Sequence, residues 1–144
     1  MPHTRGLHGR GRTIVAKREG AGLLVVTVAG VLDADSGKTL DASVRAELAM
    51  GPIERVLVDL RGLTNCELLG RAALTDLQTW LRSRVKRTAY VTATPRFRGM
   101  THIVIHNALD ENAATFVQRA EADAWLGASE LRQVVHARVL GGKS

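Results

Sequence analysis

The sequence predicts an α/β domain with a mostly parallel sheet of four to five strands and about four helices. Short apolar runs rich in β-branched residues alternate with longer segments whose apolar residues recur at helical spacing. The connections between these segments are short, which is typical of βαβ units with right-handed crossovers. The chain has 144 residues, enough for a single domain with one core.

The first two strands and the first helix are predicted from the N-terminal third. We expect a short edge strand over Thr13–Arg18 and a buried strand over Leu23–Val28, which Gly30 ends. The next residues contain three N-cap candidates, Asp33, Asp35 and Ser36. A helix follows, with an apolar stripe and then a stop at Gly51-Pro52; the stripe is Leu40, Val44 and Leu48.

The central third predicts a second strand–helix unit. Val56–Leu60 is expected as a buried strand, followed by a turn over Gly62–Asn65. A long helix is predicted from about Glu67, with one apolar side made of Leu69, Ala73, Leu77, Trp80 and Leu81. In this arrangement Leu69 points into the core, and Leu68 is the more exposed of the two leucines.

The C-terminal third predicts two more strands and two more helices. Ala89–Ala93 is expected as a strand, and Pro95 as part of the first turn of a helix. The letters of His102–His106 favour a strand by propensity, but the spacing of Phe97, Met100 and Val104 favours a helix, which we predict. A short strand over Ala114–Gln118 and a helix from Ala120 complete the domain.

The composition along the chain indicates the domain organisation and the cellular compartment of the protein. Residues 1–12 are predicted to form a flexible basic leader, 13–127 the domain, 128–140 an additional helix and 141–144 a flexible tail. No apolar run reaches the ~20 residues of a membrane span, and the N-terminus lacks the apolar core of a signal peptide. We therefore expect a cytoplasmic protein, in agreement with the single cysteine, Cys66.

The net charge of +6 is unevenly distributed along the chain. Basic residues cluster in the leader and in a second stretch without acids between them: Arg82, Arg84, Lys86, Arg87, Arg96 and Arg98. Aromatic residues make up 3% of the chain, too few for the stacking platforms of single-strand binders. We expect a solvated basic surface here in preference to a nucleic-acid or membrane site, and docking of the basic leader on anionic membrane or nucleic acid stays open as a weaker alternative.

The motifs of common enzymes are incomplete. Gly37-Lys38-Thr39 resembles the end of a phosphate loop, but Leu32 occupies the position of the first glycine. His102 and His106 share one helical face without a third metal ligand in clear register. There is no serine-hydrolase elbow and no dinucleotide fingerprint. The sequence therefore predicts no catalytic residue, no metal site and no cofactor.

Several motifs in order resemble those of STAS domains, the family of the anti-sigma factor antagonists. Ala29–Asp33 resembles the G-x-L-D turn that precedes the first helix, and Asp59–Leu74 (DLRGLTNCELLGRAAL) resembles the second signature, D-L-S-x-V-x-x-M-D-S-S-G-L. Thr94-Pro95 resembles the turn after the next strand. The closing strand and ADAWL segment, up to Leu126, resemble the branch described as STAS/SEC14-like. The resemblance covers about residues 13–127 and implies the STAS fold.

The resemblance also exposes one chemical difference. The phosphoacceptor serine of the family falls on Leu68, which has no hydroxyl group and cannot accept phosphate. Glu67 keeps the acidic position of the motif, and Gly70 keeps the glycine that permits a close approach. Thr64 lies nearby in the sequence and stays open as another acceptor.

These observations predict a non-enzymatic regulatory or scaffolding module that binds a protein partner, such as an anti-sigma-like kinase or another regulator. In parallel sheets, partners and ligands meet the carboxyl ends of the strands. The residues expected there are Asp33, Asn65, Glu67, Leu68, Arg71, Arg96 and Arg98. Two alternatives remain open: a small ligand (a nucleotide or an acyl lipid) beside Leu68, and a homodimer through the edge strand Thr13–Arg18.

Overall fold

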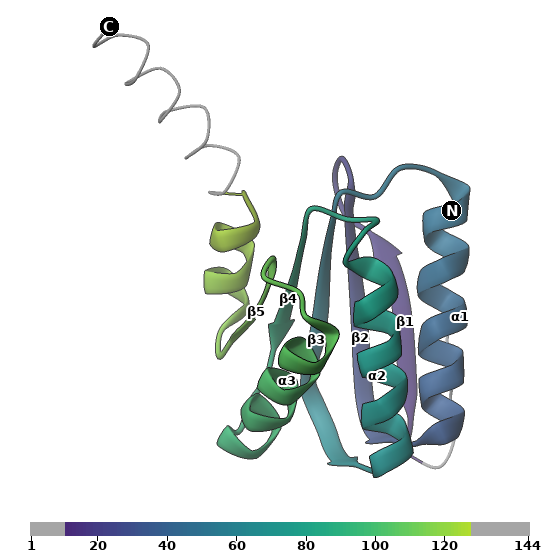
Figure 1. The fold of residues 1–144 in the computed structure, drawn as a ribbon, viewed down its shortest axis with the longest axis vertical. Helices are drawn as coiled ribbons and strands as arrows, with labels where there is room; N and C mark the ends of the chain where they lie inside the picture. The colour runs from purple at the N-terminus through teal and green to yellow at the C-terminus, as the bar shows by residue number, and fades with distance from the viewer. Residues whose placement is uncertain (1–10, 128–144) are drawn as a thin grey trace, which may run out of the picture.

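The computed structural model of the chain describes residues 11–127. Five strands and four helices follow one another in the predicted order (Figure 1). The elements are β1 (Thr13–Arg18), β2 (Leu23–Leu32), α1 (Ala34–Met50), β3 (Arg55–Cys66), α2 (Leu68–Leu81), β4 (Arg87–Val91), α3 (Pro95–Ala108), β5 (Ala113–Phe116) and a last helix at residues 119–127. The prediction of an α/β domain is confirmed. The predicted helix 128–140, the tail 141–144 and residues 1–10 of the leader lie outside the described residues.

The five strands form one sheet in the order β1-β2-β3-β4-β5. β1 pairs antiparallel with β2, while β2 through β5 are parallel to one another. The carboxyl ends of these four parallel strands therefore lie at the same side of the sheet, which we call the carboxyl edge. α1, α2 and α3 each begin there, immediately after β2, β3 and β4.

The helices cover the two faces of the sheet unequally. α1, α2 and α3 pack on one face and enclose the main core, in which Leu40, Leu77 and Val104 are buried against the strands (Figure 1). On the other face the last helix buries Ala122 and Leu126 in a smaller cluster. Successive side chains of the central strands point to opposite faces of the sheet, so these strands contribute to two separate apolar layers.

β2 and β3 are longer than predicted. Gly30 does not end β2, because its positive φ of 82° allows the strand to kink and continue to Leu32. The predicted turn over Gly62–Asn65 is also wrong. That segment pairs with the end of β2 through a register shift, and its Leu63 is buried in the main core. Backbone pairing and burial thus outweigh the local turn signal of a glycine.

The predicted apolar side of α2 is rotated from the observed one. The buried positions are Gly70, Leu74, Leu77, Gln78 and Leu81, and Leu69 is exposed. The prediction that Leu69 points into the core is therefore wrong. The cause is Gly70, whose missing side chain lets the first turn of α2 lie directly on the end of β2.

The remaining boundaries lie close to the predictions. β4 is shifted by two residues toward the N-terminus from the predicted strand Ala89–Ala93 and has the same length. β5 ends at Phe116 and not at Gln118. The segment His102–His106 is helical as predicted, inside α3. Pro95 occupies the first turn, and the Thr94 side chain accepts a hydrogen bond from the backbone N–H of Phe97.

A buried polar network ties α2 to the sheet. The Tyr90 hydroxyl of β4 donates to the side-chain carbonyl of Gln78, and the Gln78 amide donates to Asp110 at 2.7 Å. The other Asp110 oxygen accepts from the backbone N–H of Asn112 at 2.8 Å. Each of these side chains has a partner despite its burial, so the network fixes the position of α2 without leaving an unpaired group.

The close contact at Gly70 gives a stability prediction. A Cβ atom added at Gly70 overlaps the carbonyl oxygen of Leu32, and backbone on both sides prevents relief. We expect Gly70→Ala to lower the free energy of unfolding by about 1–3 kcal/mol, the usual cost of overpacking, as measured by urea denaturation.

Gly99 provides the matched control, because it also lies inside a helix but has open space around its Cα. Gly99→Ala should raise the free energy of unfolding by about 0.5–1 kcal/mol through the lower entropy of the unfolded chain. Equal stability of the two variants would contradict the proposed contact.

Candidate functional site

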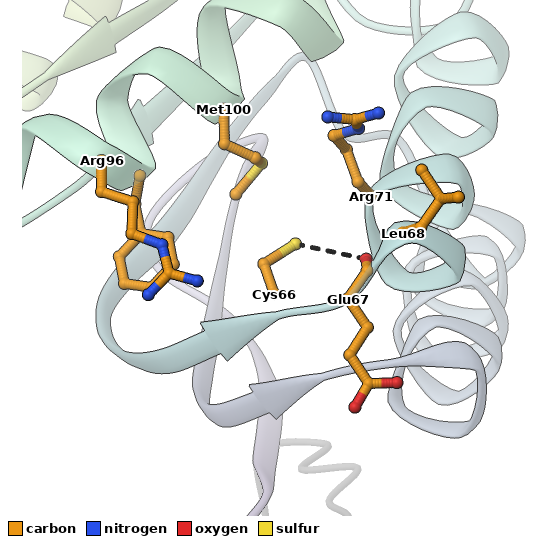
Figure 2. A pocket seen from close by; sticks show the side chains of 7 residues that line it. Cys66, Glu67, Leu68, Arg71, Arg96 and Met100 are labelled. Carbon is orange, nitrogen blue, oxygen red and sulfur yellow. Dashed lines mark hydrogen bonds between the residues drawn. The ribbon is translucent and has the colours of Figure 1, made fainter.

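A shallow pocket lies at the carboxyl edge, between the first turns of α2 and α3. We call it the edge pocket. Its volume is about 260 Å³, and its lining residues are Cys66, Glu67, Leu68, Arg71, Arg96, Phe97 and Met100. In Figure 2 Cys66 and Met100 face each other across the pocket, and Arg96 and Arg71 approach it from α3 and α2. Four predicted site residues, Glu67, Leu68, Arg71 and Arg96, therefore line one cavity.

The first turn of α2 is held close to the end of β2. The backbone N–H of Glu67 donates to the carbonyl oxygen of Leu32 at 2.8 Å. Glu67 is the N-cap residue of α2, but its side chain makes no capping hydrogen bond. In Figure 2 this side chain extends away from Cys66. The carboxylate of Glu67 is therefore available to a partner, close to the positive end of the helix dipole.

Leu68 and Leu69 are both exposed at the start of α2. Their exposed fractions are 69% and 63%, which are large values for leucine beside a core. The prediction that Leu68 is exposed is confirmed, while Leu69 joins it instead of entering the core. The two side chains form an apolar pair next to the charged groups of the edge pocket.

Arg96 is positioned by two contacts at the carboxyl edge. Its guanidinium donates to the side-chain oxygen of Asn65 at 2.9 Å, and it also lies 5.2 Å from the centre of the Phe97 ring. Asn65 thus acts on the edge pocket through Arg96, although it does not line the cavity. This hydrogen bond joins the end of β3 to the start of α3.

The thiol of Cys66 is partly buried in the edge pocket. It donates a hydrogen bond to the carbonyl oxygen of Glu67, with an Sγ to O distance of 3.7 Å (Figure 2). Burial raises the pKa of this thiol above its ordinary value, although the positive charges of Arg71 and Arg96 act in the opposite direction. Cys66 is therefore mostly a neutral thiol at neutral pH.

Asp33 lies at the carboxyl edge but outside the edge pocket. Its carboxylate accepts from the backbone N–H of Ser36 at 3.0 Å, and the Ser36 hydroxyl accepts from the Asp33 N–H, which forms a capping box at α1. The hydrogen bond from the Ser36 N–H lowers the pKa of Asp33, and the ion pair with Arg12 acts in the same direction. Asp33 therefore has a clear structural role.

Arg98, the remaining predicted site residue, is half-buried on α3 and does not line the edge pocket. Sequence reasoning missed three lining residues: Cys66, Phe97 and Met100. The spacing of Phe97 and Met100 indicated a buried helical face, which is correct, but it gave no sign that this face ends at a pocket.

Between residues 11 and 127, no group of three His, Cys, Asp or Glu side chains is arranged to hold a metal ion. His102 and His106 are both exposed on α3. No helix in the same range is both long and apolar enough to cross a bilayer.

Comparison with known protein families identifies the family of the chain. Residues 15–107 match the family described as "Mlab, STAS domain". This match covers more than half of the chain and extends over β2 and all but the last residue of α3, with the edge pocket between them. The protein belongs to this STAS domain family. The resemblance seen in the sequence is therefore confirmed, and a search of curated proteins found no match.

Solved structures show the same fold at low sequence identity. The anti-sigma factor antagonist SpoIIAA in its unphosphorylated form has a TM-score of 0.60 at 13% identity, over 83% of this chain and 97% of that chain. An anti-sigma factor antagonist from Mycobacterium paratuberculosis has a TM-score of 0.60 at 19% identity, over 83% and 98%. An uncharacterized protein of the DUF3478 family from Shewanella loihica, with a SpoIIAA-like fold, has a TM-score of 0.60 at 18% identity, over 83% and 97%.

The raised pKa of Cys66 gives a reactivity prediction. Because a raised pKa reduces the thiolate fraction at a given pH, iodoacetamide should alkylate native Cys66 several-fold more slowly at pH 8 than it alkylates Cys66 in urea. The rate should rise with pH through an apparent pKa that is higher in the native protein than in urea.

Two variants separate the contributions to this reactivity. Arg71→Gln removes a positive charge that favours the thiolate, so alkylation should become slower still. Arg45→Gln, whose side chain lies in a different cavity, should leave the rate unchanged. A native rate equal to the rate in urea would contradict the burial of the thiol.

Proposed function

We propose that this domain is a non-enzymatic regulatory or scaffolding module that binds a protein partner through the carboxyl edge. The docking surface consists of the exposed leucine pair Leu68–Leu69 together with Glu67, Arg71 and Arg96. Asn65 supports it by holding Arg96, and Asp33 by capping α1 beside it. The likeness to anti-sigma factor antagonists supports a partner that is itself a regulator, such as an anti-sigma-like kinase.

The exposure of the leucine pair is the observation that carries this proposal. Two adjacent leucines with more than half of their surface exposed lie at the first turn of a helix, where each could be buried by a partner. Glu67, Arg71 and Arg96 line the same pocket as Leu68 and supply charges of both signs near it. An apolar centre with a charged rim is the usual organisation of a protein interface.

The leucine at position 68 also determines how binding is controlled. Phosphorylation of a hydroxyl at the first turn of a helix would add about two negative charges there, and Leu68 has no hydroxyl. Partner binding at this surface is therefore constitutive or governed by a different signal. The exposed Thr64, near the end of β3, is a second position where phosphate could act.

Leu68→Asp tests the docking surface. The substitution places a charge in the centre of the interface, so partners captured by the wild-type chain and identified by mass spectrometry should bind about tenfold more weakly or worse. An acidic residue in the first turn is compatible with the helix dipole, so α2 should remain folded.

Leu109→Asp is the matched control, because Leu109 is 70% exposed but lies at the opposite end of α3. It should leave the affinity for the same partners unchanged. Unchanged capture of every partner by Leu68→Asp would overturn the assignment of this surface.

The edge pocket itself supports a second candidate function, the binding of a small ligand such as a nucleotide or lipid. Its two guanidinium groups can bind an anionic headgroup, and Met100 and Phe97 can contact apolar atoms. Its volume of about 260 Å³ is small for a drug-sized ligand, which favours the protein partner.

Native mass spectrometry of freshly purified protein distinguishes these two candidates. We expect no mass in addition to that of the polypeptide. A stoichiometric additional mass that Arg96→Gln removes would favour the ligand instead. A homodimer through β1, which lies at the edge of the sheet, stays a prediction that the same spectrum tests.

A further inference from the structure

A second cavity lies at the opposite end of α1 and α2 from the edge pocket. Its volume is about 440 Å³. We call it the Trp80 groove, and its lining residues are Arg45, Leu48, Ala49, Pro52, Ile53, Trp80 and Arg84. These residues come from the last turns of α1 and α2 and from the connections that lead to β3 and β4, so the groove lies at the end where the parallel strands begin. The proposed docking surface includes none of them.

Two arginines stack on the tryptophan that forms part of this groove. The guanidinium carbon of Arg84 lies 4.2 Å from the centre of the Trp80 ring, and that of Arg45 lies 4.5 Å from it. Such stacking holds a long side chain in place and leaves its edge able to donate hydrogen bonds. The groove therefore combines a fixed pair of cationic groups with an apolar floor.

The hydrogen bonds of Arg84 within the described structure are few. Its Nη1 group donates to the carbonyl oxygen of Trp80 at 2.8 Å and to the Ser83 hydroxyl at 3.3 Å. These bonds help to cap the end of α2, and they use part of the five N–H donors of a guanidinium. No carboxylate of residues 11–127 pairs with Arg84.

The carboxylates near the groove are already engaged. Asp41 accepts from Arg45 at 2.9 Å, and Glu54 pairs with Lys86 at 3.5 Å. No acidic side chain is among the described residues that line the groove. The groove is therefore positively charged as well as apolar, and its Arg84 is a residue of the basic stretch that the proposed docking surface does not use.

We propose that the Trp80 groove is a second protein-docking site, which binds an acidic segment of a partner protein with a large apolar side chain beside its carboxylates. The apolar side chain lies on Leu48, Ile53 and Trp80, while a carboxylate accepts hydrogen bonds from Arg84. Arginine and tryptophan are the residue types that dominate interface energetics. Because stacking already orders the two guanidinium groups, less entropy is lost when they bind. This proposal stands independently of the docking surface at the carboxyl edge.

The chain contains two tryptophans, which allow a direct test by NMR. Trp125 lies in the smaller core cluster against Phe116, so its indole N–H signal reports on a distant site. The ¹⁵N-labelled full chain is titrated with the acetylated peptide amide Asp-Glu-Leu-Leu-Asp-Glu, and the two signals are assigned with Trp125→Phe. We expect a saturable shift of the Trp80 signal and an unchanged Trp125 signal.

Four comparisons make this test specific. The neutral peptide Asn-Gln-Leu-Leu-Asn-Gln should bind about tenfold more weakly, because it lacks the carboxylates. Arg84→Gln should weaken binding of the acidic peptide by about the same factor. Arg82→Gln should leave it unchanged, since Arg82 follows the same helix but bonds the backbone of Ala108 and Leu109 instead. Leu68→Asp should also leave it unchanged.

Several results would overturn the proposal. They are no saturable shift of the Trp80 signal, equal binding of the two peptides, and equal losses in Arg84→Gln and Arg82→Gln. Sedimentation of the free protein adds a fourth: self-association that Arg84→Gln abolishes would assign the groove to a second copy of the chain. The Trp125 signal verifies in each variant that the domain remains folded.

Discussion

The contact between Gly70 and the end of β2 is the constraint on which the carboxyl edge depends. α2 begins where β3 ends, and the backbone N–H of Glu67 bonds the carbonyl oxygen of Leu32. Only glycine can lie this close to the end of β2, because a Cβ at position 70 would occupy the space of that carbonyl oxygen. The face of α2 that carries Gly70 must therefore point at the sheet. As a result, Leu68 and Leu69 point to solvent.

A similar contact extends this constraint to α1. A Cβ atom at Gly37 would lie 2.6 Å from that of Ala73, so the first turns of α1 and α2 lie unusually close together. The buried network of Gln78, Tyr90 and Asp110 then holds the other half of α2 on the sheet. A helix fixed at both ends presents its exposed side chains in one orientation, which lowers the entropy lost when a partner binds them.

The two ends of α1 and α2 offer different chemistry. At the carboxyl edge, a pair of leucines lies among charges of both signs, which matches a mixed surface on a regulatory protein. At the other end, the guanidinium groups of Arg45 and Arg84 stack on Trp80, and we propose that they bind an acidic segment. Under the two proposals made above, the module holds two proteins at once, as a scaffold does.

The sequence alone determined the order of the elements and the family. Buried strands such as β2 and β4 are continuous runs of apolar and β-branched residues, and such runs are recognisable without a structure. Pro95 and the spacing of Phe97, Met100 and Val104 correctly outweighed the strand propensity of His102–His106. Because the motif around Leu68 has no gap, the sequence also supports our proposal that Leu68 occupies the position of the family's phosphoacceptor serine.

Tertiary structure decided the lengths of β2 and β3 and the rotation of α2. Gly30 and Gly62 indicated that the two strands end there. Hydrogen bonding between β2 and β3 instead extends both strands to the carboxyl edge. The spacing of apolar residues in α2 is compatible with either of two neighbouring helix faces being buried. Only the contact of Gly70 with the end of β2 determines which of them faces the sheet. The edge pocket and the Trp80 groove likewise depend on residues far apart in the chain, because a cavity is defined by packing between elements and not by any one segment.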